Sequence, residues 1–113
     1  MDMSHFLDVQ MDDEKSVKEF LAQNAMTHQV IHNTLLENGI IVSSIPMLFE
    51  RIDDDFLSAH HYEHLAWAQA LGINLGTDLA NTDPSDQLQM QDWLSQHYDD
   101  TVLVAQALGL QVM

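Results

Sequence analysis

The chain has 113 residues, 46% of them hydrophobic, with 18 acidic residues against three basic ones and a formal net charge of −15. This length and apolar content suit one folded domain and exclude a disordered acidic tail. The charge argues against direct nucleic-acid binding, which requires Lys and Arg to neutralise phosphates. Because the chain has no cysteine, disulfides, thiolate catalysis and cysteine-ligated zinc are also excluded.

Residues 1–12 have no helical pattern and are predicted to form an N-terminal arm, followed by a single helical domain at 13–110. The arm lacks the basic start and the apolar stretch of a signal peptide, so we expect no secretion by that route. No apolar run approaches the ~20 residues that a membrane span requires. We therefore expect no membrane partner.

Apolar residues then recur at intervals of three and four in three segments, which predicts helices at about 13–38, 45–71 and 84–108. Loops of roughly six to ten residues separate these segments and reach at most ~20–36 Å. A loop of that length returns the chain to the same end of a long helix only if it is nearly straight. The sequence therefore predicts an all-α, three-helix bundle with antiparallel, up-down-up packing.

Capping signals place the ends of these helices. The first is predicted to begin at Asp12 or Asp13 and the second to stop at Gly72. For the third, Asp83 is the predicted cap, and Pro84 occupies the first turn, where its missing N–H costs nothing.

The chain also contains an internal similarity. Residues 56–73 align without gaps on 93–110, with eight of the eighteen positions identical, and a looser copy begins at Phe20, 36 residues before Phe56. Such spacing is typical of a repeated helical unit. It predicts a bundle built from three related repeats of about 36 residues, with Phe20, Phe56 and Trp93 in equivalent core positions.

Polar residues interrupt the apolar stripes at matching places. Asn24, His60 and His97 lie near the middle of the three predicted helices, so we expect them to meet in one polar layer. His28, His60, His64 and His97 are candidate metal ligands, because helical bundles bind metal ions through inward imidazoles and carboxylates. The Glu-x-x-His pattern of di-metal bundles is absent, however. We therefore favour side chains that hydrogen-bond one another, and expect no metal or cofactor.

Two acidic runs, Asp53-Asp54-Asp55 and Asp99-Asp100, lie within predicted helices. They lack the regular oxygen spacing and the glycine of a calcium loop, and they predict a solvated acidic face. The chain also lacks a glycine-rich phosphate loop and a nucleophile elbow with its triad. We therefore assign no catalytic residue and expect no enzyme activity.

The third predicted helix follows Asp78-Leu79 and Asp83-Pro84, contains Asp92-Trp93-Leu94 and His97, and ends in Ala107-Leu108-Gly109-Leu110. This pattern resembles small acidic virion-associated proteins of tailed bacteriophages, in which an Asp-Pro-capped stretch leads to an aromatic-Leu-x-x-His helix ending in Ala-Leu-Gly. The resemblance implies a structural or assembly protein of the virion, located in the virion or the host cytoplasm. Its partners would be phage structural proteins, in a multi-copy assembly, and no binding residue is carried over.

The function favoured by these observations is a non-enzymatic acidic module that docks on a basic or polar surface of a larger protein. Apolar residues in the arm and in the first loop are the candidate docking residues, namely Phe6, Leu7, Val9, Ile40, Ile41 and Val42. Two alternatives stay open. One is an acidic mimic of nucleic acid that inhibits a host protein, and the other is a metal-binding helical bundle based on the histidines.

Overall fold

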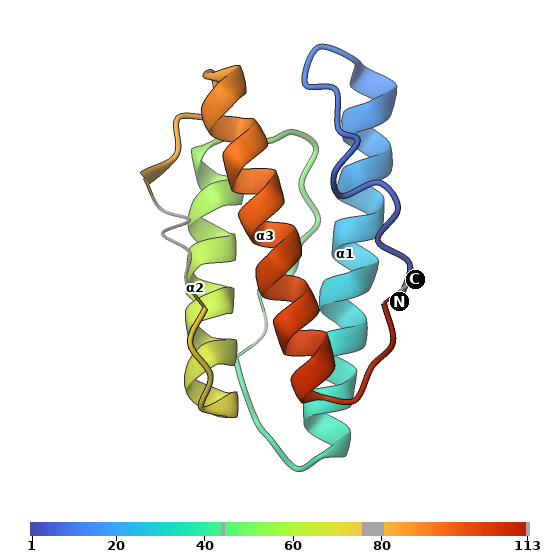
Figure 1. Cartoon of the computed structure of the whole chain (residues 1–113), viewed down its shortest axis with the longest axis vertical. Coiled ribbons are helices and arrows are strands. Elements are labelled where there is room, and N and C mark those ends of the chain that lie inside the picture. Colours follow the sequence, from blue (N-terminus) through green and yellow to red (C-terminus); the bar gives the residue numbers. More distant parts are fainter. Residues whose placement is uncertain (44, 76–80, 113) are drawn as a thin grey trace.

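The computed structural model describes residues 1–43, 45–75 and 81–112, and within them it has three helices and no strand. The helices are α1 (Glu14–Glu37), α2 (Asp54–Leu71) and α3 (Gln87–Ala107), shown in Figure 1. The all-α prediction is confirmed for these residues. None of the helices in this part of the chain combines the length and hydropathy needed to cross a membrane. Ser44, Asp78 and Leu79 lie outside the described residues.

The three helices run in the same direction, so their N-terminal ends share one end of the molecule (Figure 1). Ring contacts agree with this direction. Phe20 near the start of α1 lies 6.0 Å from Phe56 near the start of α2, and Phe56 lies 5.3 Å from Trp93 in α3, between ring centroids. A second core cluster joins the C-terminal halves through Ile31, Leu35, Trp67 and Val104. The predicted antiparallel arrangement is therefore wrong, while the expected burial of Phe20, Phe56 and Trp93 in the core is confirmed.

The error arose because α2 begins at Asp54 rather than near residue 45. By the helix bounds, the connections 38–53 and 72–86 have sixteen and fifteen residues, and such lengths reach up to ~50 Å when extended. Within the first connection, Met47 and Phe49 face the core while Pro46 and Leu48 are exposed. This alternation has the period of an extended chain, which carries the polypeptide back to the end where α1 began.

The N-terminal caps differ from prediction at two helices, since α2 begins after Asp53 rather than near residue 45 and α3 begins after Asp86 rather than Asp83. The N-cap residues of the three helices are Asp13, Asp53 and Asp86, and each side chain accepts hydrogen bonds from backbone N–H groups of its own first turn. Asp83 does not cap α3. Its carboxylate instead accepts from the backbone N–H and the hydroxyl of Ser85, and Pro84 precedes the helix. The predicted stop at Gly72 is confirmed, since this residue has φ of 64° and ends α2 in the left-handed conformation.

The N-terminal arm packs on the helices instead of extending into solvent (Figure 1). Met3, Phe6 and Val9 are buried in the first core cluster. The Phe6 ring packs edge-on against Phe20 at 5.5 Å and stacks on His97 at 5.2 Å. Phe6 and Val9 therefore belong to the protein's own core and are not available for docking, because removing them from water stabilises the chain by itself.

Candidate functional site

Four histidines from all three helices meet in the core. His28 lies on α1, His60 and His64 on α2, and His97 on α3, and each is at most 3% exposed. Their six ring-centroid separations run from 4.9 Å to 6.1 Å. The structure therefore brings together all four histidines that the sequence offered as candidate metal ligands, and they come from all three helices.

The expected polar layer is present around His60. Asn24 Nδ2 lies 2.8 Å from His60 Nε2, and His60 Nδ1 lies 2.7 Å from the carbonyl oxygen of Phe56. Since an amide nitrogen can only donate and a carbonyl oxygen can only accept, His60 carries its proton on Nδ1 and accepts on Nε2. This arrangement defines a neutral imidazole.

Glu63 is the acceptor for three groups around the cluster. Its Oε1 accepts from His28 Nδ1 at 2.8 Å and from His32 Nε2 at 2.6 Å, and its Oε2 accepts from the backbone N–H of Ile45 at 3.2 Å. Burial alone would raise the pKa of Glu63, but the hydrogen bonds and charges of His28 and His32 together lower it to about 2. Because Glu63 is ionised at neutral pH, His28 holds its proton on Nδ1 and leaves Nε2 as a lone pair.

The remaining part of the cluster is not satisfied by hydrogen bonds. His64 Nδ1 lies 3.5 Å from Asp100 Oδ2, outside hydrogen-bond geometry, and His97 has no partner at either ring nitrogen among the described residues. The prediction of a fully hydrogen-bonded layer is therefore wrong at His97. Asp100, expected on a solvated acidic face, is only 3% exposed, because it is on the side of α3 that faces α2.

Three of the four histidines are held in their neutral form. Burial lowers the pKa of His28 to about 4, even though Glu63 opposes that shift. Burial also lowers the pKa of His60 and of His97 well below the ordinary value, with the neighbouring histidines adding to the effect. Neutral imidazoles have a free lone pair, which is the form that binds metal ions.

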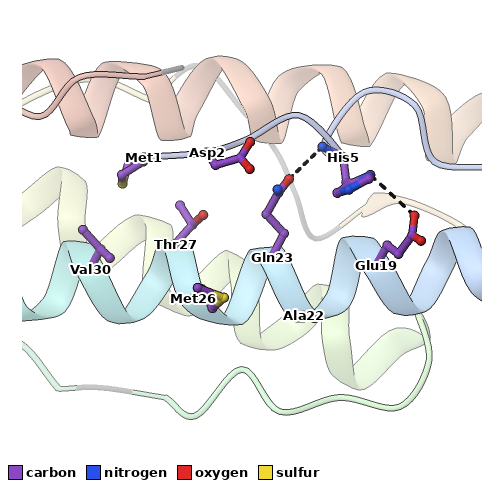
Figure 2. Close-up of a pocket in the computed structure, with 9 residues that line it drawn as sticks. All are labelled: Met1, Asp2, His5, Glu19, Ala22, Gln23, Met26, Thr27 and Val30. Atoms are coloured by element: carbon purple, nitrogen blue, oxygen red, sulfur yellow. Dashed lines mark hydrogen bonds and ion pairs between the residues drawn. The ribbon is translucent and has the colours of Figure 1, made fainter.

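A second feature lies on the surface, where a groove of about 340 Å³ separates the arm from α1 (Figure 2). Its apolar side is formed by Ala22, Met26 and Val30 of α1. Met26 is 70% exposed and Val30 39%, so this stripe of α1 is left uncovered by the rest of the described chain.

Polar groups border the same groove. Asp2 on the arm and Glu19 on α1 contribute carboxylates, and His5 lies between arm and helix (Figure 2). The backbone N–H of His5 donates to Gln23 Oε1 at 2.7 Å, and its ring nitrogen lies 3.6 Å from Glu19 Oε2. The groove therefore combines an apolar stripe with negative charge.

The other candidate docking residues have different environments. Leu7 is 54% exposed and Ile41 is 89% exposed, so both remain accessible. Ile40 and Val42 are partly buried against the second core cluster. Together with Leu36, residues 40–42 border a smaller groove of about 210 Å³ beside the C-terminal half of α1.

Sequence reasoning missed Asp100 as part of the histidine site and did not pair Glu63 with His28 and His32. Glu63 stands three residues after His60, and Asp100 three residues after His97, so each lies on the same helix face as a cluster histidine. That spacing was the available signal. The acidic composition concealed it, because a carboxylate in so acidic a chain is expected at the surface.

Comparison of the chain with family models, with curated proteins and with solved structures found no match.

Proposed function

We propose that this protein is a non-enzymatic interaction module that binds a basic segment of a larger protein in the groove between its arm and α1. The observation that carries the proposal is the juxtaposition of exposed Met26 and Val30 with the carboxylates of Asp2 and Glu19. A Lys or Arg side chain fits such a surface, because its aliphatic stem covers apolar atoms while its charged end reaches a carboxylate.

The charge of the chain supports a basic partner. Each of the three basic side chains already pairs with an acidic neighbour, as Lys15–Glu19 at 3.9 Å, Lys18–Glu14 at 2.9 Å and Arg51–Asp53 at 3.1 Å. The net charge of −15 is therefore not offset by a free cation of the chain itself. A basic partner would be steered toward the protein and would relieve its self-repulsion.

The nature of the partner follows from the resemblance to virion-associated proteins of tailed phages. We propose a phage structural protein as the partner, with this chain acting in the virion or during its assembly, in several copies. The proposal includes an origin of the fold in three related repeats. Support for the repeats comes from the contact of Asn24 with His60, 36 residues apart, and of His60 with His97, 37 residues apart.

The groove can be tested by affinity capture from infected-cell lysate, with captured proteins identified by mass spectrometry. Deleting the arm would not be informative, because it removes Phe6 from the core. We expect the double variant Met26→Ser, Val30→Ser to lose a basic partner that the wild type captures. The matched control is Leu88→Ser, which changes a 75% exposed residue on α3. Equal capture by the double variant and the wild type would reject the groove.

A second proposal, an acidic mimic of nucleic acid, is favoured by the direction of the helices. Parallel packing gathers acidic residues from the three helix starts at one end of the molecule, namely Asp12, Asp13, Glu14, Asp53, Asp54, Asp55, Asp83 and Asp86. Capture that survives the groove variant, but is lost in Asp54→Asn, Asp55→Asn and at moderate salt, would support the mimic instead.

A further inference from the structure

We propose that the buried histidine cluster binds one Zn²⁺ ion, with His28, His60 and His97 as ligands, one from each helix. This inference is independent of the docking groove, because none of the three ligand histidines lines that groove. It concerns a site that would hold the three helices together.

The first support is convergence. One ring nitrogen from each of the three histidines lies within 4.8 Å of the others, and all three residues are buried. Zinc–nitrogen bonds of about 2.0–2.1 Å in a tetrahedral site place ligand nitrogens roughly 3.3 Å apart and ring centroids roughly 5 Å apart. The observed centroid separations of 4.9 Å for His28–His60 and 5.1 Å for His60–His97 agree with this spacing, whereas the 6.0 Å between His28 and His97 must shorten on binding.

The second support is the orientation of the rings. His28 Nδ1 donates to Glu63 and His60 Nδ1 donates to the Phe56 carbonyl oxygen, so Nε2 is the nitrogen with the lone pair in both residues, free in His28 and hydrogen-bonded to Asn24 in His60. Metal-binding histidines usually donate the other ring N–H to a carboxylate or a backbone carbonyl, which fixes the tautomer and the ring direction. The cluster shows both kinds of acceptor.

The third support is the set of polar atoms without a partner among the described residues. It includes His28 Nε2 and both ring nitrogens of His64 and of His97. Buried polar atoms are nearly always paired in native proteins, so several unpaired nitrogens in one small region require a partner. A metal ion accepts several lone pairs from one position, which one hydrogen-bonding side chain does not.

The fourth support is charge. A divalent cation in the core requires compensating negative charge, and carboxyl groups lie directly behind two of the imidazoles. Glu63 contacts His28 at 2.8 Å, and Asp100 lies 3.5 Å from His64. Two carboxylates would balance one Zn²⁺ ion, and both are at most 3% exposed. Neutral imidazole suits zinc among the common metal ions, whereas Ca²⁺ and Mg²⁺ prefer oxygen ligands.

Binding requires two local changes. The three nitrogens must approach one another, and His60 Nε2 must release its hydrogen bond from Asn24. His64 lies 5.1 Å from His97 but 5.8 Å from His28 and 6.1 Å from His60 between ring centroids, so it would have to move inward to provide the fourth ligand. A site closed by four protein ligands in the core would be structural, since catalytic zinc keeps an open position.

The test uses the full chain, freed of metal with a chelator and titrated at neutral pH with Co²⁺ and then Zn²⁺. We expect one Co²⁺ per chain with the visible absorption bands of tetrahedral coordination, displacement by Zn²⁺, and a rise in the thermal midpoint. Affinity should fall at least tenfold in His28→Gln and in His97→Gln. The matched control is His61→Gln, a histidine of α2 outside the cluster, which should bind as the wild type does.

A folded wild-type chain that binds neither ion at one equivalent would overturn the proposal and leave ordered water as the partner of these nitrogens. Binding that is equally strong in the cluster variants and the wild type would also overturn it. If a variant fails to fold, nitrogen-15 spectra of the imidazole rings of the wild type, recorded with and without Zn²⁺, test the proposal instead. Zn²⁺ must then shift Nε2 of His28, His60 and His97. Shifts confined to His5 and His61 would place the metal on the surface and contradict the proposal.

Discussion

Asn24 on α1 donates to Nε2 of His60 on α2 at 2.8 Å, and both side chains are fully buried. The pair joins the middles of two helices that run in the same direction, 36 residues apart in the chain. His97, which lies 5.1 Å from His60 between ring centroids, extends the same level to α3. This level is the centre of the protein, with one core cluster toward the helix starts and another toward their ends.

Replacing Asn24 by Ala should destabilise the fold by about 1–3 kcal/mol, since His60 Nε2 would remain buried without its donor. Chemical denaturation at neutral pH measures the effect. Asn33→Ala is the control, because Asn33 lies on the same helix but is exposed, and it should change stability by less than about 0.5 kcal/mol. Equal effects of the two substitutions would contradict the structural role of the pair.

The docking of the arm predicts a large effect of Phe6→Ala. The Phe6 side chain is fully buried between Phe20 and His97, so its removal leaves a cavity and should cost about 3–5 kcal/mol. The neighbouring Leu7→Ala changes a 54% exposed residue and should be nearly neutral. Similar unfolding midpoints for Phe6→Ala and the wild type would show that the arm is free in solution.

Glu63→Gln should loosen the connection between α1 and α2. The backbone N–H of Ile45 donates to Glu63 Oε2, so its hydrogen exchange should be slow in the wild type and at least tenfold faster in the variant, on the order of 1.4 kcal/mol of protection. Glu50→Gln, an exposed change in the same connection, should leave this exchange rate unaltered. An unchanged exchange rate of the Ile45 N–H in Glu63→Gln would show that Glu63 does not hold this connection in place.

Helix direction can be tested with a spin label, because the chain has no natural cysteine. A nitroxide attached to Asp55→Cys, at the exposed start of α2, should broaden amide signals near Leu88 at the start of α3. Signals near Val104, at the other end of α3, should remain sharp. Broadening of the Val104 region instead would restore an antiparallel arrangement.

Stability of the metal-free protein should fall as pH decreases from 7 to 5. The folded-state pKa values of His28, His60 and His97 are lowered, so the unfolded chain binds more protons below its pKa of ~6.5. The loss begins near pH 6.5 and stops growing below the folded pKa, about 4 for His28. Between pH 6.5 and 5 it should reach about 2 kcal/mol per histidine.

Glu63 contacts His28, His64 packs beside His28, and Asp100 lies beside His64. Glu63, whose pKa is lowered to about 2, stays ionised throughout this range. Relief of carboxylate repulsion acts in the opposite direction, so a comparison of variants is needed. Thermal melts of the wild type and of the double variant His60→Gln, His97→Gln separate the contribution of the buried histidines from that of the carboxylates. Identical pH profiles would show that the buried histidines do not account for the pH dependence.

Much of the local structure was determined by the sequence itself. The apolar spacing predicted three helices, and the ends at Asp13 and Gly72 agree with the structure, because capping depends on residues within one turn. The matching positions of Asn24, His60 and His97 predicted a shared polar layer, since residues at helix midpoints meet whichever way the helices run.

Helix direction, the docking of the arm and the carboxylate contacts of the buried histidines were decided only by tertiary structure. Direction depended on residues 45–53, which are not helical; Met47 is buried there and Phe49 packs on the first core cluster. Phe6 and Val9 cover core surface that the three helices alone leave open. The three-residue spacing from His60 and His97 puts Glu63 and Asp100 on the histidine faces of their helices, but their contacts with His28 on α1 and His64 on α2 depend on how the helices pack.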